Sequence, residues 1–217
     1  MGGNRHCDPP PQVASVTAAM ALAGRQGEIV QATLDLAFDV GPDAVSTSLI
    51  AKRLGLSQPA IYKHFKTKDA IWLAACGLLS DRITDNIQTC RASLQPPMQR
   101  LRDLILRHLT FIQEVPALPD IMVMRHASAS HQVIRQRLQA EMARLHQEIV
   151  TRIQHMQDQG GIRTDLAATD AATLVMGVMQ GLVLRMIVSR DPSRLVVEGA
   201  RLFDLQIAGL APRKTTP

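Results

Sequence analysis

Polar and basic side chains gather between Ser46 and Lys68, in the segment STSLIAKRLGLSQPAIYKHFKTK. The amide of Gln58 could pair with adenine through two hydrogen bonds, and the ammonium of Lys63 could bind guanine or a phosphate. Hydroxyl, imidazole and ammonium groups, together with helix N-termini, bind the phosphates of nucleic acids. The residue types of this segment therefore predict recognition of double-stranded DNA.

The same segment predicts two short helices joined by a tight turn. Gly55 gives the backbone the freedom that a helix end needs, and Ser57 can cap the next helix, as Ser46 can cap the first. Pro59 falls in a first helical turn, where its missing N–H costs nothing. Each helix carries one apolar stripe at four-residue spacing: Ile50 and Leu54, then Ile61 and Phe65. This pattern is typical of a helix-turn-helix whose second helix enters the major groove.

The stretch from about Glu28 to Ala75 resembles the DNA-binding domain of TetR-type transcriptional repressors. The matching residues are Gly41, Ile50-Ala51, Gly55-Leu56-Ser57, Ile61-Tyr62-Lys63-His64-Phe65 and Lys68-Asp69-Ala70. The resemblance implies a homodimer with a divergent, all-helical C-terminal domain that binds an inducer. It also implies that the hydroxyl of Tyr62 binds a phosphate, although a purely structural tyrosine is the alternative. The chain departs from the family where Pro59 replaces a common glycine, Ala60 a common hydroxyl residue and Leu49 a frequent acidic residue.

The outer positions of the second helix are the expected DNA contacts. Base contacts are expected from Gln58, Pro59, Ala60 and Lys63. Ala60 could only meet a thymine methyl, and Lys63 could equally bind phosphate. A solvated polar residue is the alternative for Gln58. Phosphate contacts are expected from Ser46, Thr47, Ser57, Tyr62, His64 and Lys68.

Composition agrees with a DNA-binding protein without requiring one. The 217 residues carry a net charge of +5, with 46% hydrophobic and 3% aromatic residues. Four of the five lysines lie in the segment from Ser46 to Lys68. The three cysteines, Cys7, Cys76 and Cys90, form no close pair, so neither a disulfide framework nor a zinc site is expected. We expect a cytoplasmic protein with no cofactor and no metal.

The chain predicts an all-α fold with two domains. Residues 1–26 are expected to be a flexible leader, or an artefact of a start codon assigned too early in the gene. A secretory signal is the alternative. Residues 27–75 form the helix-turn-helix domain, residues 76–210 a helical domain for effector binding and dimerisation, and residues 211–217 a tail. The apolar periodicity predicts these helices: Glu28–Val40, one capped by Ser46, Gln58–Phe65, one from Lys68 to about Ser93, Met98–Val115, Pro119–Ala127, His131–Gln159, Asp165–Ser189 and Ser193–Ala208.

The C-terminal half suggests an effector pocket and a dimer interface. Methionine is abundant there and suits a pocket for a flexible apolar ligand, although it is also ordinary core filler. The expected pocket residues are His108, Phe111, Met122, Met142 and Met176. Residues 171–184 carry no charge, so their helix must be covered on most sides; a membrane helix is the competing interpretation. The expected interface residues are Gly177, Gly181, Leu184, Leu202 and Phe203.

Motifs for catalysis are missing from the sequence. There is no G-x-S-x-G, no phosphate-binding loop and no dinucleotide fingerprint. His126 and His131 could bind a metal, and a helical-bundle metalloenzyme is the rival from another class. We expect a sequence-specific transcriptional regulator that is not an enzyme, a repressor released from a palindromic operator by a small apolar effector. A ligand-independent regulator or an activator would share every one of these residues.

Overall fold

The computed structural model describes residues 24–123 and 129–212, and this part of the chain is helical with no strand. The predicted all-α fold is therefore confirmed. The helices are α1 (Arg25–Val40), α2 (Thr47–Leu54), α3 (Gln58–His64), α4 (Lys68–Ala92), α5 (Pro97–Glu114), α6 (Leu118–Val123), α7 (Ala129–Asp158), α8 (Ala168–Ser189) and α9 (Leu195–Gly209), and a 3-10 turn covers Pro42–Ala44.

Two helices begin three residues away from their predicted first residue. The first helix begins at Arg25, so Arg25 and Gln26 belong to α1 and not to the predicted leader. The side chain of Gln26 donates a hydrogen bond to the carbonyl of His64 at 3.2 Å and so joins α1 to the end of α3. α8 begins at Ala168 rather than at Asp165. Residues 1–23, most of the predicted leader, lie outside the described residues.

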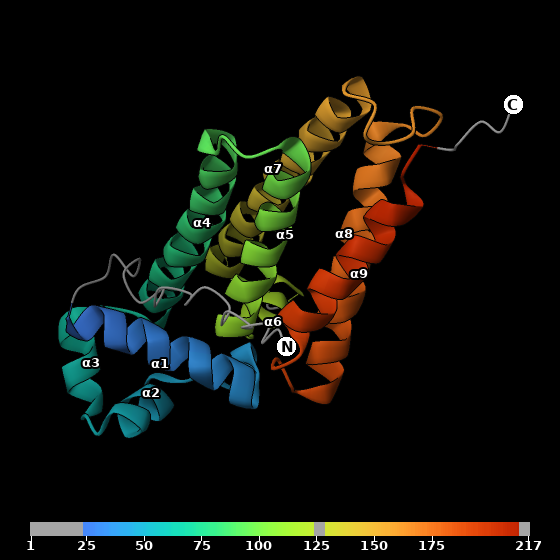
Figure 1. Ribbon diagram of the computed structural model, residues 1–217. Coiled ribbons are helices and arrows are strands. Elements are labelled where there is room, and N and C mark those ends of the chain that lie inside the picture. Colours follow the sequence, from blue (N-terminus) through green and yellow to red (C-terminus); the bar gives the residue numbers. More distant parts are fainter. Residues whose placement is uncertain (1–23, 124–128, 213–217) are drawn as a thin grey trace, which may run out of the picture.

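Helices α1, α2 and α3 form a small unit at one end of the molecule, and the first turns of α4 complete its core (Figure 1). The core consists of side chains that are at most 1% exposed: Ile29, Val30, Ile50, Ile61, Ile71 and Trp72. Burial of these large apolar groups fixes the angle between α2 and α3, which are too short to be stable alone.

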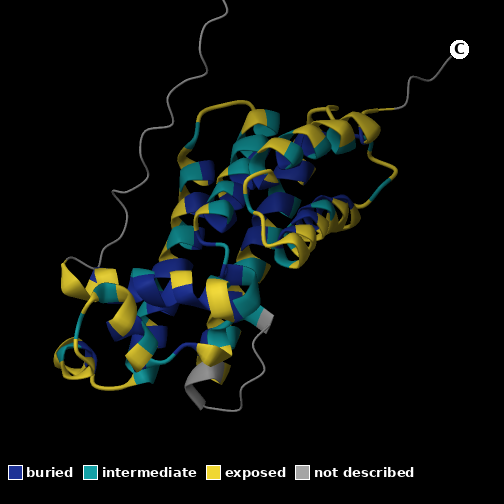
Figure 2. Cartoon of the chain, turned by 90° about the horizontal axis from the view of Figure 1, so that it is seen from below, coloured by how far each residue is buried: buried dark blue, intermediate teal, exposed yellow. Residues whose placement is uncertain are grey.

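α4 continues beyond this unit and joins a second bundle, in which it packs against α5 and α7 while α8 and α9 cover the far side (Figure 1). Buried residues lie between these helices and exposed residues on the outside (Figure 2). Cys76 and Cys90 are buried and free. Burial raises the pKa of both thiols, which lowers the fraction present as the reactive thiolate.

Candidate DNA-binding face and effector pocket

The turn between α2 and α3 has the geometry that its sequence predicts, with one exception. The hydroxyl of Ser46 accepts a hydrogen bond from the Leu49 N–H at 3.2 Å and caps α2. Gly55 adopts a left-handed conformation with φ 65°, and the Leu56 N–H donates to the Ala51 carbonyl at 2.9 Å. The predicted side-chain cap by Ser57 is wrong, because only the Ser57 carbonyl accepts hydrogen bonds from α3. The Ser57 hydroxyl is thus left for solvent.

α3 turns one face inward and the other outward. Ile61 is fully buried, whereas Tyr62 is 40% exposed. The exposed residues at and along α3 are Ser57, Gln58, Pro59, Tyr62, Lys63 and His64. Ser46, Ala60 and Lys68 are partly exposed. Nine of the ten residues expected to contact DNA are therefore accessible, and their contacts with DNA stay a prediction.

Thr47 is the residue of this set whose position differs from the expectation. It is 6% exposed, and its hydroxyl accepts a hydrogen bond from Nε2 of Gln58 at 2.8 Å. The hydroxyl of Tyr62 lies 3.4 Å from the Thr47 hydroxyl. The Thr47 hydroxyl is thus engaged within the protein, and its contact with a phosphate stays a prediction. It fixes the amide of Gln58 while leaving the amide oxygen and one N–H free, which are the two groups needed for adenine.

Replacement of Thr47 by valine should weaken base discrimination. The substitution keeps the side-chain shape but removes the hydrogen bond that holds Gln58. A bidentate amide–adenine pair is worth about 1–3 kcal/mol of discrimination, or roughly 5- to 150-fold. Gln58 keeps its amide and loses only its support, so we expect part of this preference for adenine to be lost, roughly 3- to 10-fold. Fluorescence anisotropy with a selected operator and its single-base variants measures this preference. Thr47→Ser, which keeps the hydroxyl, is the control; equal preference in all three proteins would contradict the assignment.

A cavity of about 270 Å³ opens between α5, α6, α7 and α8. The described residues that line it are His108, Ile112, Leu118, Pro119, Met122, Met142, Met176, Met179, Gln180, Val183, Leu184 and Ile187. Four of the five predicted pocket residues are brought together here. Phe111 is the exception: it lies beside the cavity, with the Arg82 guanidinium 4.8 Å from its ring centroid.

His108 is the polar group buried deepest in this cavity wall. Its side chain is 2% exposed, and its Nδ1 has no hydrogen-bond partner among the described residues. The ring of Phe111 packs edge-on against it, with centroids 6.3 Å apart. Burial lowers the pKa of His108 to about 4, so the imidazole is neutral at physiological pH.

Acid should destabilise the fold through His108. Below about pH 6.5 the unfolded chain binds a proton at this residue, whereas the folded chain does so only near pH 4. Stability therefore falls as the pH is lowered across this window, by roughly 3 kcal/mol in full. Denaturant titrations at pH 7 and pH 4.5 should show a smaller loss for His108→Phe than for the unsubstituted protein. His155 is exposed and provides the control: His155→Asn should lose as much stability between pH 7 and pH 4.5 as the unsubstituted protein.

The outer side of α8 and α9 is apolar and uncovered in the single chain. Gly177 and Gly181 have open space where a Cβ would stand. Leu184 is 60% and Val188 79% exposed. With Leu174, these residues form one stripe along α8 at alternating steps of three and four residues, which we call the α8 stripe. The sequence contained this signal at Leu174 and Val188, although neither was among the predicted interface residues.

The prediction for Phe203 is wrong. This side chain is 3% exposed and packs inside the protomer, where it cannot meet a partner. Leu202 is partly exposed. The outward-facing apolar residues of α9 are instead Val197 and Leu205, which are 74% and 59% exposed.

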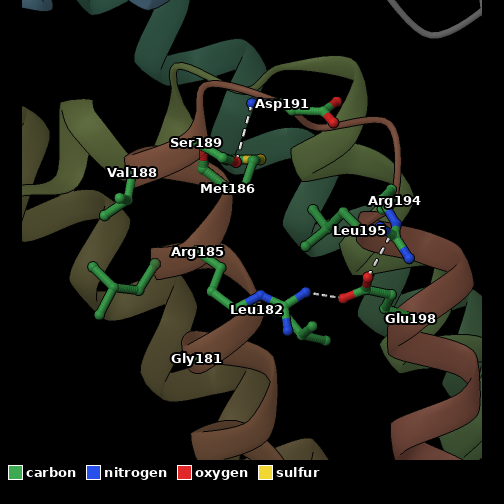
Figure 3. A pocket seen from close by; sticks show the side chains of 11 residues that line it. Gly181, Leu182, Arg185, Met186, Val188, Ser189, Asp191, Arg194, Leu195 and Glu198 are labelled. Atoms are coloured by element: carbon green, nitrogen blue, oxygen red, sulfur yellow. Dashed lines mark hydrogen bonds and ion pairs between the residues drawn. The ribbon is translucent and has the colours of Figure 1, made fainter.

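A hollow of about 580 Å³ separates the end of α8 from the start of α9, beside the α8 stripe (Figure 3). Glu198 lies in it between two arginines. It pairs with Arg185, and its Oε1 lies 3.1 Å from Nε of Arg194. A partner that covers the stripe would meet this charged cluster at one edge.

α8 is the one helix among the described residues that is long and apolar enough to cross a membrane, with a mean hydropathy of 1.8 in its most apolar window. The same helix packs against α7 and α9 through its other faces. No group of three or more metal-binding side chains occurs within residues 24–123 and 129–212. His126 and the side chain of His131, the two possible metal ligands, lie outside the description.

Sequence comparison assigns both parts of the chain. The signature of "Bacterial regulatory proteins, tetR family" matches residues 29–75, and that of "BetI-type transcriptional repressor, C-terminal" matches residues 97–201. The chain belongs to the TetR family of transcriptional regulators. This TetR regulator is thus a DNA-binding transcriptional regulator, as its helix-turn-helix predicts.

Individual relatives of this TetR regulator are distant. The nucleoid occlusion factor SlmA of Yersinia enterocolitica is 27% identical over 86% of the chain and 94% of that relative. SlmA of Photobacterium profundum is 28% identical over 61% of the chain and 66% of its own length.

Solved structures share the fold at low sequence identity. The ketosteroid transcriptional regulator KstR2 of Mycobacterium tuberculosis has a TM-score of 0.72 at 16% identity, over 90% of the chain and 99% of that structure. The regulator FadR of Bacillus subtilis, in complex with stearoyl-CoA, has a TM-score of 0.63 at 18% identity, over 84% of the chain and 97% of that structure. The family and these neighbours are transcriptional regulators and not enzymes.

Proposed function

We propose that this TetR regulator is a cytoplasmic homodimeric repressor, without catalytic activity, that leaves a roughly palindromic operator when a small apolar effector fills the cavity behind α6. Each protomer places α3 in one major groove, so the distance between the two α3 helices must match the spacing of the half-sites. The effector favours a dimer in which that distance no longer fits, and release is a shift between two states.

The observation that carries this proposal is a connection from the cavity to α1. Leu118 and Pro119, at the start of α6, line the cavity. Asp120 on the same helix accepts a hydrogen bond from Nη1 of Arg190 at 2.8 Å, and the same nitrogen donates to the Phe38 carbonyl of α1 at 3.2 Å.

Arg190 therefore joins the end of α8, α6 and α1 at one point. Its guanidinium also lies 5.4 Å from the Phe38 ring centroid, a distance at which a cation and an aromatic ring attract each other. Arg190 has a φ of 54°, a backbone conformation that non-glycine residues seldom adopt. A ligand that moves α6 would act on these contacts and so on the position of α1.

Two relatives make an apolar effector reasonable. One structural neighbour was solved with stearoyl-CoA, and another is named a ketosteroid regulator. Both names refer to molecules with a large apolar part. The cavity here is mainly aliphatic and methionine-lined, which suits an apolar ligand of smaller size.

Operator selection from the DNA upstream of its own gene, followed by binding in the presence of candidate effectors, tests the proposal. We expect a salt-sensitive, sequence-specific complex that Tyr62→Ala and Lys63→Ala weaken and an effector dissolves. Absence of a specific complex would overturn the whole proposal. A specific complex that no ligand releases would favour the ligand-independent alternative.

Arg190→Ala should uncouple the effector from the operator. The substitution leaves the cavity and α3 intact, so each ligand alone should bind with nearly unchanged affinity. The effect of one on the other should shrink by roughly 2- to 30-fold, because positions between coupled sites carry about 0.5–2 kcal/mol of coupling. Operator titrations with and without effector measure it. Arg163→Ala, which breaks an Arg–Asp pair before the start of α8, is the control and should retain full coupling.

A further inference from the structure

We propose that a second copy of the chain closes the mouth of the cavity, so that the effector site is complete only in the dimer. Effector binding and dimerisation then strengthen each other. This inference rests on the proposed function, because it concerns the same cavity and the same dimer, and it adds how the two are linked.

The mouth of the cavity lies on α8. Two of the described lining residues are exposed, Gln180 and Leu184, and both belong to this helix. Leu184 is 60% exposed, whereas His108 of α5 and Leu118 of α6 are at most 2% exposed. The cavity wall is therefore buried deepest at α5 and α6 and most accessible to solvent along α8.

This mouth is continuous with the α8 stripe. Leu184 belongs to the stripe, and it is the one described side chain that lines both the cavity and the hollow between α8 and α9. Gly181, which follows Gln180 in the chain, lines the same hollow and has open space at its Cβ. A helix that packs on the stripe at Gly181 therefore also covers the mouth.

Apolar side chains left in water are concentrated on this face of the protomer. Ten large apolar side chains are exposed among the described residues, and five of them lie on α8 or α9: Leu174, Leu184, Val188, Val197 and Leu205. A concentration of exposed apolar surface marks an interaction site. The mouth of the cavity thus opens onto the surface that most needs a partner.

A second copy of the chain is the partner that this surface fits. An interface across a two-fold axis places a patch against its own copy, so the patch must be complementary to itself. Residues 171–184 carry no charge, and the charges at the end of α8 are of both signs: Arg185 and Arg194 beside Asp191 and Glu198 (Figure 3). Apolar surface therefore meets apolar surface, and arginines can meet carboxylates at the edge.

Closure by a partner changes the surroundings of the effector. Ligand sites bury roughly 70–90% of a ligand's surface, whereas the single chain leaves the side of the effector at the mouth in water. A partner that covers the mouth removes this apolar surface from water, which the hydrophobic effect favours. Because coupling between two binding events is reciprocal, the effector stabilises the dimer by the factor by which the dimer tightens the effector. Release from the operator then comes from an intact dimer with altered spacing and not from separation of the protomers.

Sedimentation equilibrium of the full-length protein, with and without an uncharged apolar probe, tests this linkage. The probe is N-phenyl-1-naphthylamine, whose fluorescence rises in apolar surroundings. We expect saturating probe to lower the dissociation constant of the dimer by roughly 5- to 150-fold for each probe bound, the usual range of coupling between two sites. An unchanged or raised dissociation constant overturns the inference, and so does a failure of the probe to bind.

The reciprocal measurement uses a monomeric variant. Val188 belongs to the stripe, lines the hollow but not the cavity, and is 79% exposed, so Val188→Asp should separate the protomers without unfolding them or touching the cavity. We expect the probe to bind this variant more weakly by the same factor, roughly 5- to 150-fold. Circular dichroism checks its helix content.

Leu94→Asp is the matched control for Val188→Asp. Leu94 is fully exposed and follows the end of α4, so this variant should stay dimeric and bind the probe as the unsubstituted protein does. Equal probe affinity in a monomeric Val188→Asp overturns the inference. If Val188→Asp stays dimeric, Gly181→Glu serves as the second variant, and two dimeric variants also overturn the inference.

Operator binding by the same preparations separates this inference from the proposed function. A probe that tightens the dimer without releasing the operator supports the shared site and refutes release through this cavity. A probe that releases the operator while the dissociation constant of the dimer stays the same supports the proposed function and refutes the shared site.

Discussion

Gly181→Glu should convert the regulator into a monomer and lower its operator affinity by about 100-fold or more. Two half-sites bound by one dimer gain roughly 10²- to 10⁴-fold over separate binding, and a monomer loses this gain. Gly181 lies in the middle of the α8 stripe, where the absence of a side chain lets a second helix approach closely. A glutamate there would place a charge against the partner's apolar surface.

The protomer itself should tolerate this substitution. No atom lies within 4 Å of a Cβ built at Gly181, and replacing a glycine inside a helix favours the helix by up to about 1 kcal/mol. The dimer of the Gly181→Glu variant would therefore dissociate while each protomer stays folded. Sedimentation equilibrium gives the oligomeric state, circular dichroism the helix content, and fluorescence anisotropy the operator affinity.

Gly77→Glu is the matched control for this experiment. Gly77 also lies inside a helix with open space at its Cβ, but that helix, α4, packs mainly against α1, α5 and α7. The control should remain dimeric and bind DNA normally. If Gly181→Glu also stays dimeric with full affinity, the α8 stripe is not the interface.

Glu148→Ala should lower the free energy of unfolding by about 3–5 kcal/mol. Glu148 is 1% exposed and pairs with Nη2 of Arg152 at 2.9 Å and with Nε of Arg91 at 2.7 Å. Arg152 is itself only 6% exposed. Removing the carboxylate leaves the Arg152 charge buried without a partner. Loss of one partner of a buried ion pair destabilises a protein more than replacement of both by apolar residues. The loss also opens the seam between α4 and α7.

Urea denaturation followed by circular dichroism measures this effect. Asp204→Ala, which breaks the exposed pair with Arg102, should cost about 1 kcal/mol or less. The double variant Glu148→Leu/Arg152→Leu should recover most of the lost stability, because neither charge remains buried. If Glu148→Ala costs no more than Asp204→Ala, the charges near Glu148 are hydrated in the folded protein.

The helix-turn-helix could be read from the sequence because its determinants are local. A left-handed glycine, a capping serine and apolar residues four apart specify two short helices and the turn between them, whatever the rest of the chain does. The same holds for the long amphipathic helices, whose periodicity is repeated over many residues. The family followed from the order of residues 41–70, and the comparison with known families confirmed it.

The exposure of individual side chains depends on which helices pack together, so it could be learned only from the tertiary structure. From periodicity alone, Leu184 and Phe203 were equivalent apolar residues on helices near the C-terminus. Packing exposes the first and buries the second, because only the fold decides which apolar stripe has a neighbour within the protomer. The sequence likewise shows a Thr47 hydroxyl that could bind phosphate. Only the packing of α3 against α2 shows that the same hydroxyl binds the amide of Gln58.

The sequence by itself thus determined the DNA-binding segment, the helical class and four of the twelve described residues that line the cavity. Only the tertiary structure decided that the nitrogen of His108 is left unpaired there, and that Arg190 reaches Phe38 across 152 positions of the chain. Short-range patterns fix helices because each turn contacts the next. Contacts between distant helices depend on how all the apolar faces are buried at once, which no single segment specifies.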